Sequence, residues 1–229
     1  MSQDKSAEQI KNQHLEQMGV ELGTIFNFLY NEVLTINYKW TEYIEVYGTN
    51  EERLKLLNKT APTYFAVVQK VLFENIVLNI ARITDPIQSM GKKNLTIKAI
   101  PQFITDDNLK ARILKCIDEI DNESSFCRDW RNRLITHSDY SLLMNEKAQP
   151  LEPANRTKID SIIKLLYEFI NELYDKYFNT RIYEKIIKAN NGVFRLLCLL
   201  DEGQTSEHDR IQRIKSGNYF ESDRIRRTL

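Results

Sequence analysis

Residues 63–84 read TYFAVVQKVLFENIVLNIARIT, and their apolar side chains recur every three or four positions. This spacing places one broad apolar stripe along an α-helix, which is typical of a helix at the centre of a bundle. The helix is expected to end at Asp85-Pro86, because proline disfavours a helical conformation for the residue before it. The stripe comprises Phe65, Val68, Leu72, Ile76, Ile80 and Ile83, widened by Val67, Val71 and Val77.

Similar periodicity on both sides of this segment predicts further helices. Turn and capping residues divide them. Asn50 is an expected N-cap, Thr105-Asp106-Asp107 is expected to cap a later helix, and another helix is expected to start from Asn155. Residues 87–94 are expected to form a loop. The expected helices are a long one over 7–47, short ones over 50–59, 95–104 and 193–200, and others over 106–120, 126–137 and 155–177.

Composition agrees with an all-α protein. The chain has 229 residues, 32 basic against 32 acidic side chains and 42% hydrophobic residues, so it can bury a core. It contains only 7 glycines and 5 prolines, too few for the turns of an all-β protein. We expect a helical bundle over residues 1–203 and a charged C-terminal tail over 204–229, which is most simply solvated.

Several classes of protein find no support in the sequence. Cys116, Cys127 and Cys198 form no CxxC pair, and no metal-spaced cluster, Gly-rich phosphate loop or nucleophile elbow is present, so neither metal nor cofactor is expected. Residues 1–17 are polar and lack the apolar core of a signal peptide, and no run of about 18 apolar residues is evident. We therefore expect a soluble, cytoplasmic protein.

The three histidines differ in their surroundings. His14 and His208 lie in polar segments and are expected at the surface. His137 shares a helical stripe with Trp130 and Leu134, which predicts packed neighbours. In an ideal helix Arg131 points about 120° away from His137, so one straight helix cannot aim both at one atom. Either the helix is distorted near His137, or two chains each contribute such a helix.

A buried histidine near arginines is expected to have a lowered pKa and to exchange protons at neutral pH. A guanidinium matches the geometry of phosphate. Together they suit RNA cleavage, in which a 2′-hydroxyl attacks its own neighbouring phosphate. The alternative is a structural histidine that bonds a backbone carbonyl or Asp139.

Residues 131–137 read RNRLITH and resemble the R-N-x4-H signature of the HEPN superfamily. The segments ARITDP at 81–86 and NLTI at 94–97, with RN at 131–132 and HSD at 137–139, resemble its AbiU-like abortive-infection branch. The similarity extends over roughly residues 20–180.

The resemblance implies a HEPN-type bundle that dimerises through the motif helices, so that two chains line one composite cleft. It also implies a metal-independent endoribonuclease acting in phage defence or as a toxin. In that case Arg131 binds the scissile phosphate, His137 transfers a proton or binds phosphate, and Asn132 orients one of them.

Four further residues have a possible place in the cleft, each with a simpler reading. Arg82 and Asp85 either line it or pair with each other at the helix end. Asp139 either orients His137 or only follows the helix, and Tyr140 either stacks on a base or is one of 11 tyrosines. A net charge of +0 gives little long-range attraction for RNA, so a structured RNA, tRNA included, would be recognised locally. The expected basic rim consists of Lys92, Lys93, Arg128 and Arg133.

Two other functions stay open. In one, the chain is a non-catalytic module that binds a nucleotide, RNA or protein. In the other, it is half of a toxin-antitoxin pair, controlled by a companion protein or by modification of a residue such as Tyr140.

Overall fold

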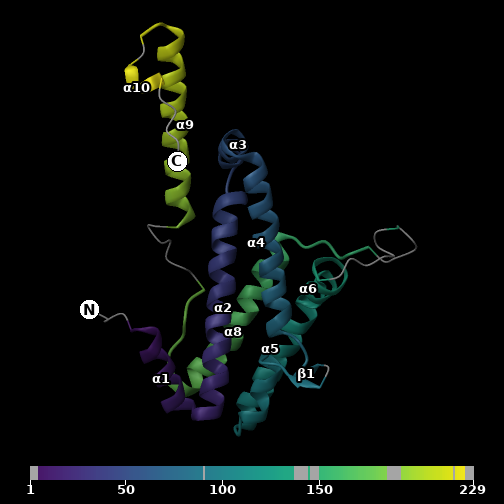
Figure 1. The fold of residues 1–229 in the computed structure, drawn as a ribbon. Coiled ribbons are helices and arrows are strands. Elements are labelled where there is room, and N and C mark those ends of the chain that lie inside the picture. Colours follow the sequence, from purple (N-terminus) through teal and green to yellow (C-terminus); the bar gives the residue numbers. More distant parts are fainter. Residues whose placement is uncertain are drawn as a thin grey trace. The chain divides into compact units, whose positions relative to one another are not determined.

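The computed structural model describes residues 5–89, 91–136, 144, 150–184, 192–218 and 220–224 (Figure 1). It confirms the expected all-α class, with one small hairpin. The helices are α1 (Ala7–Met18), α2 (Val20–Tyr47), α3 (Glu51–Thr60), α4 (Pro62–Ile83), α5 (Asp107–Glu123), α6 (Ser125–Trp130), α8 (Arg156–Phe178), α9 (Val193–Lys215) and α10 (Glu221–Arg224). A 3-10 helix η1 (Ile97–Phe103), a π-helix η2 (Arg131–Ile135) and strands β1 (Gln88–Ser89) and β2 (Lys92–Lys93) complete the described elements.

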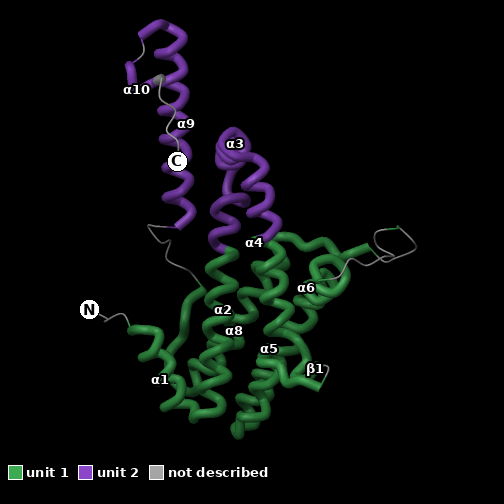
Figure 2. Tube along the Cα trace, in the orientation of Figure 1, with its two compact units in different colours: residues 1–40, 72–186 green, residues 41–71, 187–229 purple. Residues whose placement is uncertain are grey.

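The chain divides into two compact units, coloured separately in Figure 2. Unit 1 contains residues 1–40 and 72–186, and unit 2 contains residues 41–71 and 187–229. The divisions fall within α2 and α4. The expected boundary at residue 203 stays a prediction.

The core of unit 1 is built from α2, the C-terminal part of α4, α5 and α8. Helices α5 and α8 pack side by side, and η1 packs against α5. The capping predicted at Thr105-Asp106-Asp107 is confirmed, and the N-cap of α5 is Asp106, whose side chain accepts a bond from the Leu109 N–H. Helix α8 starts after Asn155 as predicted, and the Asn155 side chain caps it by accepting a bond from the Lys158 N–H. Fully buried side chains include Phe26, Leu29, Ile36, Ile76, Ile80, Ile83, Ile113, Ile120, Ile162, Leu166 and Phe169.

The expected single helix over residues 7–47 is wrong, because the chain turns at Gly19. Its φ of +79° is a backbone conformation that L side chains rarely adopt, so glycine permits the sharp turn between α1 and α2. Gly23 then allows the two helices to meet, since an added Cβ would lie only 2.6 Å from the carbonyl oxygen of His14. The periodic apolar pattern crosses this turn without a break, which explains the error.

His14 is buried and not at the surface as expected. Only 1% of it is exposed. Its Nδ1 lies 3.0 Å from Asn27 Oδ1 and its Nε2 lies 2.9 Å from the hydroxyl of Tyr174, so both ring nitrogens have partners. Burial lowers the pKa of His14, with the Asn27 hydrogen bond opposing that shift. The rings of Phe26, Tyr30, Tyr174 and Phe178 surround the imidazole edge to face.

Helix α4 is only partly a core helix. Val77 is fully buried as predicted, but Val67 and Val71 are 57% and 59% exposed, so the expected width of the stripe is wrong there. Among the described helices α4 alone is long and apolar enough to cross a membrane by length and composition, with a mean hydropathy of 1.3 in its most apolar window. The core helix of a soluble protein meets the same criterion, and Ile76, Ile80 and Ile83 are fully buried.

Unit 2 has a small core of its own in which α3 and α9 pack together. Its buried residues are Val46, Leu57, Phe65 and Leu197. The expected N-cap of α3 is confirmed, since Asn50 accepts a bond from the Arg53 N–H.

Helix α9 was expected to stop before Asp201, but it continues to Lys215. Gly203 lies inside it without ending it, because a single glycine in a helix costs only about 1 kcal/mol. His208 lies on this extension and is exposed, as expected.

Candidate functional site

The candidate site begins where α4 ends. Thr84 directly follows the helix and is fully buried, and its hydroxyl bonds the carbonyl oxygens of Ile80 and Ala81. Asp85 comes next, and its side chain is 20% exposed. Pro86 prevents further helix, so the sequence places one buried hydroxyl and one partly exposed carboxylate side by side at the end of α4.

The motif itself lies on a distorted helix. Helix α5 ends at Glu123, α6 restarts at Ser125, and residues 131–135 form a π-helix in which the Thr136 N–H bonds the carbonyl of Arg131 at 2.9 Å. π-helical turns are rare and are frequent at functional sites. The sequence left two alternatives, a helix distorted near His137 or a pair of motif helices from two chains. The π-helix shows that the residues just before His137 are distorted.

Arg131 meets Asp85 at this point. Its Nη1 lies 2.7 Å and 2.6 Å from the two carboxylate oxygens of Asp85, and its Nε donates to Asn132 Oδ1 at 3.0 Å. Within the described ranges no acceptor bonds the third nitrogen, Nη2, and the Arg131 side chain is 25% exposed. Asp85 and Asn132 thus fix two edges of the guanidinium, and no described residue uses the donors of the third.

Arg128, three residues before Arg131, links the end of α4 to the last turns of α5. Its guanidinium donates to the hydroxyl of Thr84 at 3.2 Å and to the carbonyl of Asp121 at 3.1 Å, and lies 3.0 Å from the Asp121 carboxylate. Lys98 lies 2.7 Å from the same carboxylate oxygen. Arg128 is thus occupied by protein acceptors and does not form an open basic rim.

Two other expected cations near the site, Arg82 and Arg133, also have carboxylate partners. Arg82 pairs with Glu32 and not with Asp85, so the simple pairing proposed for the helix end does not occur. Arg133 lies 3.1 Å from Asp129 one turn away. The structure thus brings Arg131, Asn132 and Asp85 together and turns Arg82 to a separate partner.

The face expected to pack around His137 is only partly packed. Trp130 donates its Nε1–H to the carbonyl of Glu152 at 2.8 Å and contacts the ring of Phe73, whereas Leu134 is 42% exposed. The π-helix changes the rotation per residue, so the stripe drawn for an ideal helix does not hold after residue 131.

His137, Asp139 and Tyr140 lie outside the described residues. Their predicted roles, and the distance from Arg131 to His137, stay predictions.

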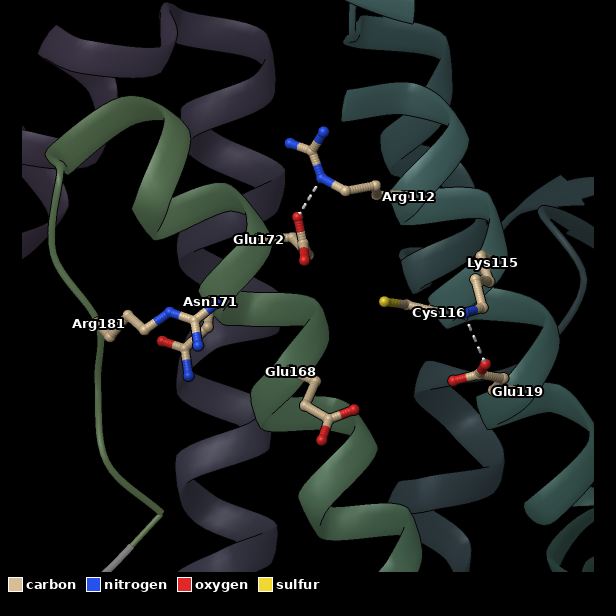
Figure 3. Close-up of a pocket in the computed structure, with 8 residues that line it drawn as sticks. All are labelled: Arg112, Lys115, Cys116, Glu119, Glu168, Asn171, Glu172 and Arg181. Atoms are coloured by element: carbon tan, nitrogen blue, oxygen red, sulfur yellow. Dashed lines mark hydrogen bonds and ion pairs between the residues drawn. The ribbon is translucent and has the colours of Figure 1, made fainter. Parts of the chain in front are cut away.

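A separate cleft of about 350 Å³ lies between α5 and α8 in unit 1 (Figure 3). Its charged side chains are already paired: Arg112 lies 2.6 Å from Glu172, and Arg181 lies 2.7 Å from Asp175 beside the cleft. Burial raises the pKa of the Cys116 thiol to about 11, so it stays protonated and weakly nucleophilic at neutral pH. No group of three His, Cys, Asp or Glu side chains in the described part of the chain is arranged to hold a metal ion.

Two residues that position the arginines of this site, Thr84 and Glu32, were not predicted from the sequence. Thr84 accepts a hydrogen bond from Arg128, and Glu32 holds Arg82 away from Asp85. A local signal for Thr84 was available, since a threonine in or after the last turn of a helix can bond the carbonyl of the residue four positions earlier. Nothing local indicates Glu32, which lies 50 residues before Arg82.

Comparison with known proteins gives one finding. The HEPN family model described as AbiU2 matches residues 19–195, most of the chain. No curated protein and no solved structure matches. The matched range contains Asp85, Arg128, Arg131 and Asn132, and nearly all of α9 lies beyond it.

Proposed function

The chain belongs to the AbiU2 family of HEPN proteins, and from this premise we propose that it is a metal-independent endoribonuclease of the cytoplasm that acts in abortive infection of phage-infected cells or as a toxin. Arg131 and His137 are its proposed catalytic residues, in a composite cleft of a homodimer.

The observation that supports the proposal most directly is how the guanidinium of Arg131 is hydrogen-bonded. Asp85 binds its Nη1 and Asn132 its Nε, so the guanidinium plane is held in one orientation, and no described residue bonds Nη2. An arginine fixed in this way can stabilise charge on a phosphate without reorganising during the reaction.

The proposed reaction needs only groups of the RNA and the protein. The 2′-hydroxyl oxygen forms a bond to the adjacent phosphorus and loses its proton, while the bond from phosphorus to the 5′-oxygen of the next nucleotide breaks and that oxygen gains a proton. The products are a 2′,3′-cyclic phosphate and a 5′-hydroxyl. His137 transfers protons, and Arg131 stabilises the negative charge that develops on the phosphoryl oxygens.

The homodimer is supported by the surface beside the motif. Leu134 is 42% exposed one turn after Trp130, where a monomer gains nothing from an apolar side chain in water. A second copy that covers Leu134 would bring a second motif helix to the cleft. RNA is the proposed substrate, tRNA included, and a companion antitoxin is a further proposed partner.

The test compares wild type with His137→Ala on total RNA and tRNA in EDTA, with mapping of all new RNA ends and circular dichroism to verify folding. EDTA excludes contaminating nucleases that depend on divalent metals. We expect wild type alone to produce cyclic phosphate and 5′-hydroxyl ends. Cleavage that survives both Arg131→Ala and His137→Ala would refute the proposal for this site.

A non-catalytic RNA- or nucleotide-binding module is the second candidate. It is favoured by the Arg131–Asp85 pair, which neutralises the arginine, and by the net charge of +0. The two candidates differ in one result: a binding module retains RNA affinity in wild type but yields no new ends, including in protein purified from phage-infected cells.

A further inference from the structure

A short β-hairpin follows the candidate site directly. Strand β1 pairs antiparallel with β2, with Gln88 opposite Lys93 and Ser89 opposite Lys92, and Gly91 makes the turn with a φ of +78°. The side chain of Asn94 donates to the carbonyl of Pro86 at 2.8 Å and to the Ser89 hydroxyl at 2.9 Å. These bonds tie the hairpin back to the residue after Asp85, so it is a defined element although it was expected to be a loop.

The hairpin carries the uncommitted positive charge of this region. In the described residues of segments 82–98 and 121–136, every other cation lies within ion-pair distance of a carboxylate: Arg82, Lys98, Arg128, Arg131 and Arg133. Lys92 and Lys93 are exposed, and no described residue bonds them. Among the described residues, a polyanion that reaches Arg131 therefore finds unpaired positive charge on these lysines and not on the neighbouring arginines.

Chain connectivity keeps these lysines near the site. Gln88 is three residues after Asp85, so their Cα atoms are at most about 11 Å apart. Lys93 lies across the ladder from Gln88, which adds about 5 Å. An RNA whose phosphate is bound by Arg131 can therefore reach both lysines with phosphates only a few nucleotides away. Because neighbouring strand residues point to opposite faces, one lysine is available on each face of the hairpin.

We propose that the hairpin of β1 and β2 anchors RNA beside the site, with Lys92 and Lys93 contacting phosphates that flank the one held by Arg131. The inference rests on the proposed function for its substrate and adds the residues that supply affinity. The hairpin contacts the RNA backbone, so it contributes binding and not base recognition.

The test measures binding of a labelled single-stranded RNA between 50 and 200 mM salt, using full-length His137→Ala protein so that the RNA stays intact. The added variant is Lys92→Ala/Lys93→Ala. The matched control is Lys11→Ala/Lys59→Ala, which removes the same charge from two exposed lysines outside the site. We expect about tenfold weaker binding at low salt and a log–log salt slope reduced by about 1.4, because each phosphate contact on a single strand contributes about 0.7. The control is expected to leave the slope unchanged.

The outcomes separate this inference from the proposed function. Equal affinity and slope in the hairpin variant and its background would overturn the hairpin inference, as would an equal loss in the control or a background protein that binds no RNA. Weaker, less salt-dependent binding by the hairpin variant alone supports it. Absence of cleavage by wild type would count against the nuclease proposal and leave the hairpin result in place.

In cleavage assays with His137 restored, the hairpin variant should raise KM about tenfold and leave kcat within about twofold, since it removes binding contacts that are the same in ground state and transition state. A loss of kcat with unchanged KM would contradict an anchoring role.

Discussion

Unit 1 contains two groups of hydrogen-bonded polar side chains, one around His14 and one around Arg131, which differ in burial and in how many of their donors and acceptors have partners. At the α1–α2 turn, His14 is 1% exposed, both its ring nitrogens have partners, and four aromatic rings enclose it. At the end of α4, Arg131 is 25% exposed and bonded at Nη1 and Nε, with Nη2 unbonded by any described residue. Sequence patterns suggested a surface role for His14 and packed surroundings for the motif.

The comparison shows that bonding capacity, more than residue type, separates a structural group from one available for chemistry. A buried polar group whose donors and acceptors are all used stabilises the fold and has nothing left for a ligand. A partly bonded group at an exposed helix end retains that capacity. Substitutions in the two groups should therefore separate stability from activity.

The largest expected effect is on catalysis. Arg131→Ala should lower kcat for RNA cleavage by about 10²–10³-fold, because it removes a preorganised donor to the developing charge. Thermal unfolding should change little. The control is Arg112→Ala, another arginine with one carboxylate partner, Glu172, which should retain full activity. Equal activity losses in both variants would mean that Arg131 has no special role in catalysis.

The next effect is on stability in the group around His14. Gly23→Ala places a Cβ against the backbone of His14 at 2.6 Å and should destabilise unit 1 by about 1–3 kcal/mol, the usual cost of overpacking. Gly203→Ala is the matched control. No atom lies within 4 Å of a Cβ there, and the helix should gain up to about 1 kcal/mol. Urea unfolding measures both changes, and a neutral Gly23→Ala would disprove the close approach of the two helices.

Asp85→Asn should have a smaller effect and tests what the ion pair does. If Asp85 holds Arg131 in place, loss of its charge should lower kcat by about tenfold while RNA affinity changes little, since a charged hydrogen bond is exchanged for a neutral one. The same RNA cleavage and binding assays measure both quantities. An increase in activity or affinity would instead show that Asp85 competes with phosphate for the arginine.

The smallest expected effect is the pH dependence of stability. Burial lowers the pKa of His14 in the folded state below its ordinary value of 6.5, so the unfolded chain binds the proton more readily. His14 therefore contributes stability above about pH 6.5 that is lost as the pH falls through its folded pKa. Urea unfolding at pH 7.5 and 5.0 should show a larger loss for wild type than for His14→Gln. His208→Gln should match wild type, because that side chain is exposed, and an equal loss in all three would refute the assignment to His14.

Local chemistry explains what could be predicted from the sequence. The starts of α3, α5 and α8 could be predicted at Asn50, within Thr105-Asp106-Asp107 and at Asn155, because a cap and its N–H partner lie only three residues apart. Arg131, Asn132 and Asp85 were identified as candidate site residues by resemblance, and the structure brings these three together.

Long-range contacts explain what could not be predicted. The pairing of Arg131 with Asp85 joins residues 46 positions apart, and nothing in their spacing favours it over a bond between Arg82 and Asp85. The burial of His14 depends on Tyr174, and its segment is polar when read alone. The π-helix was not predicted either, because residues 131–135 have no proline or glycine to mark a departure from ideal geometry.

The bond between His14 and Tyr174 also orders events during synthesis of the chain. The two residues are separated by 160 positions, so at roughly 5–20 residues per second the ribosome needs about 8–30 s between them. Residues 84 and 131 are both made within that interval, whereas α1 waits for α8 before its histidine gains its second partner. The helix that is translated first thus waits for α8, and a nascent chain exposes His14, Phe26 and Tyr30 until Tyr174 and Phe178 have been made.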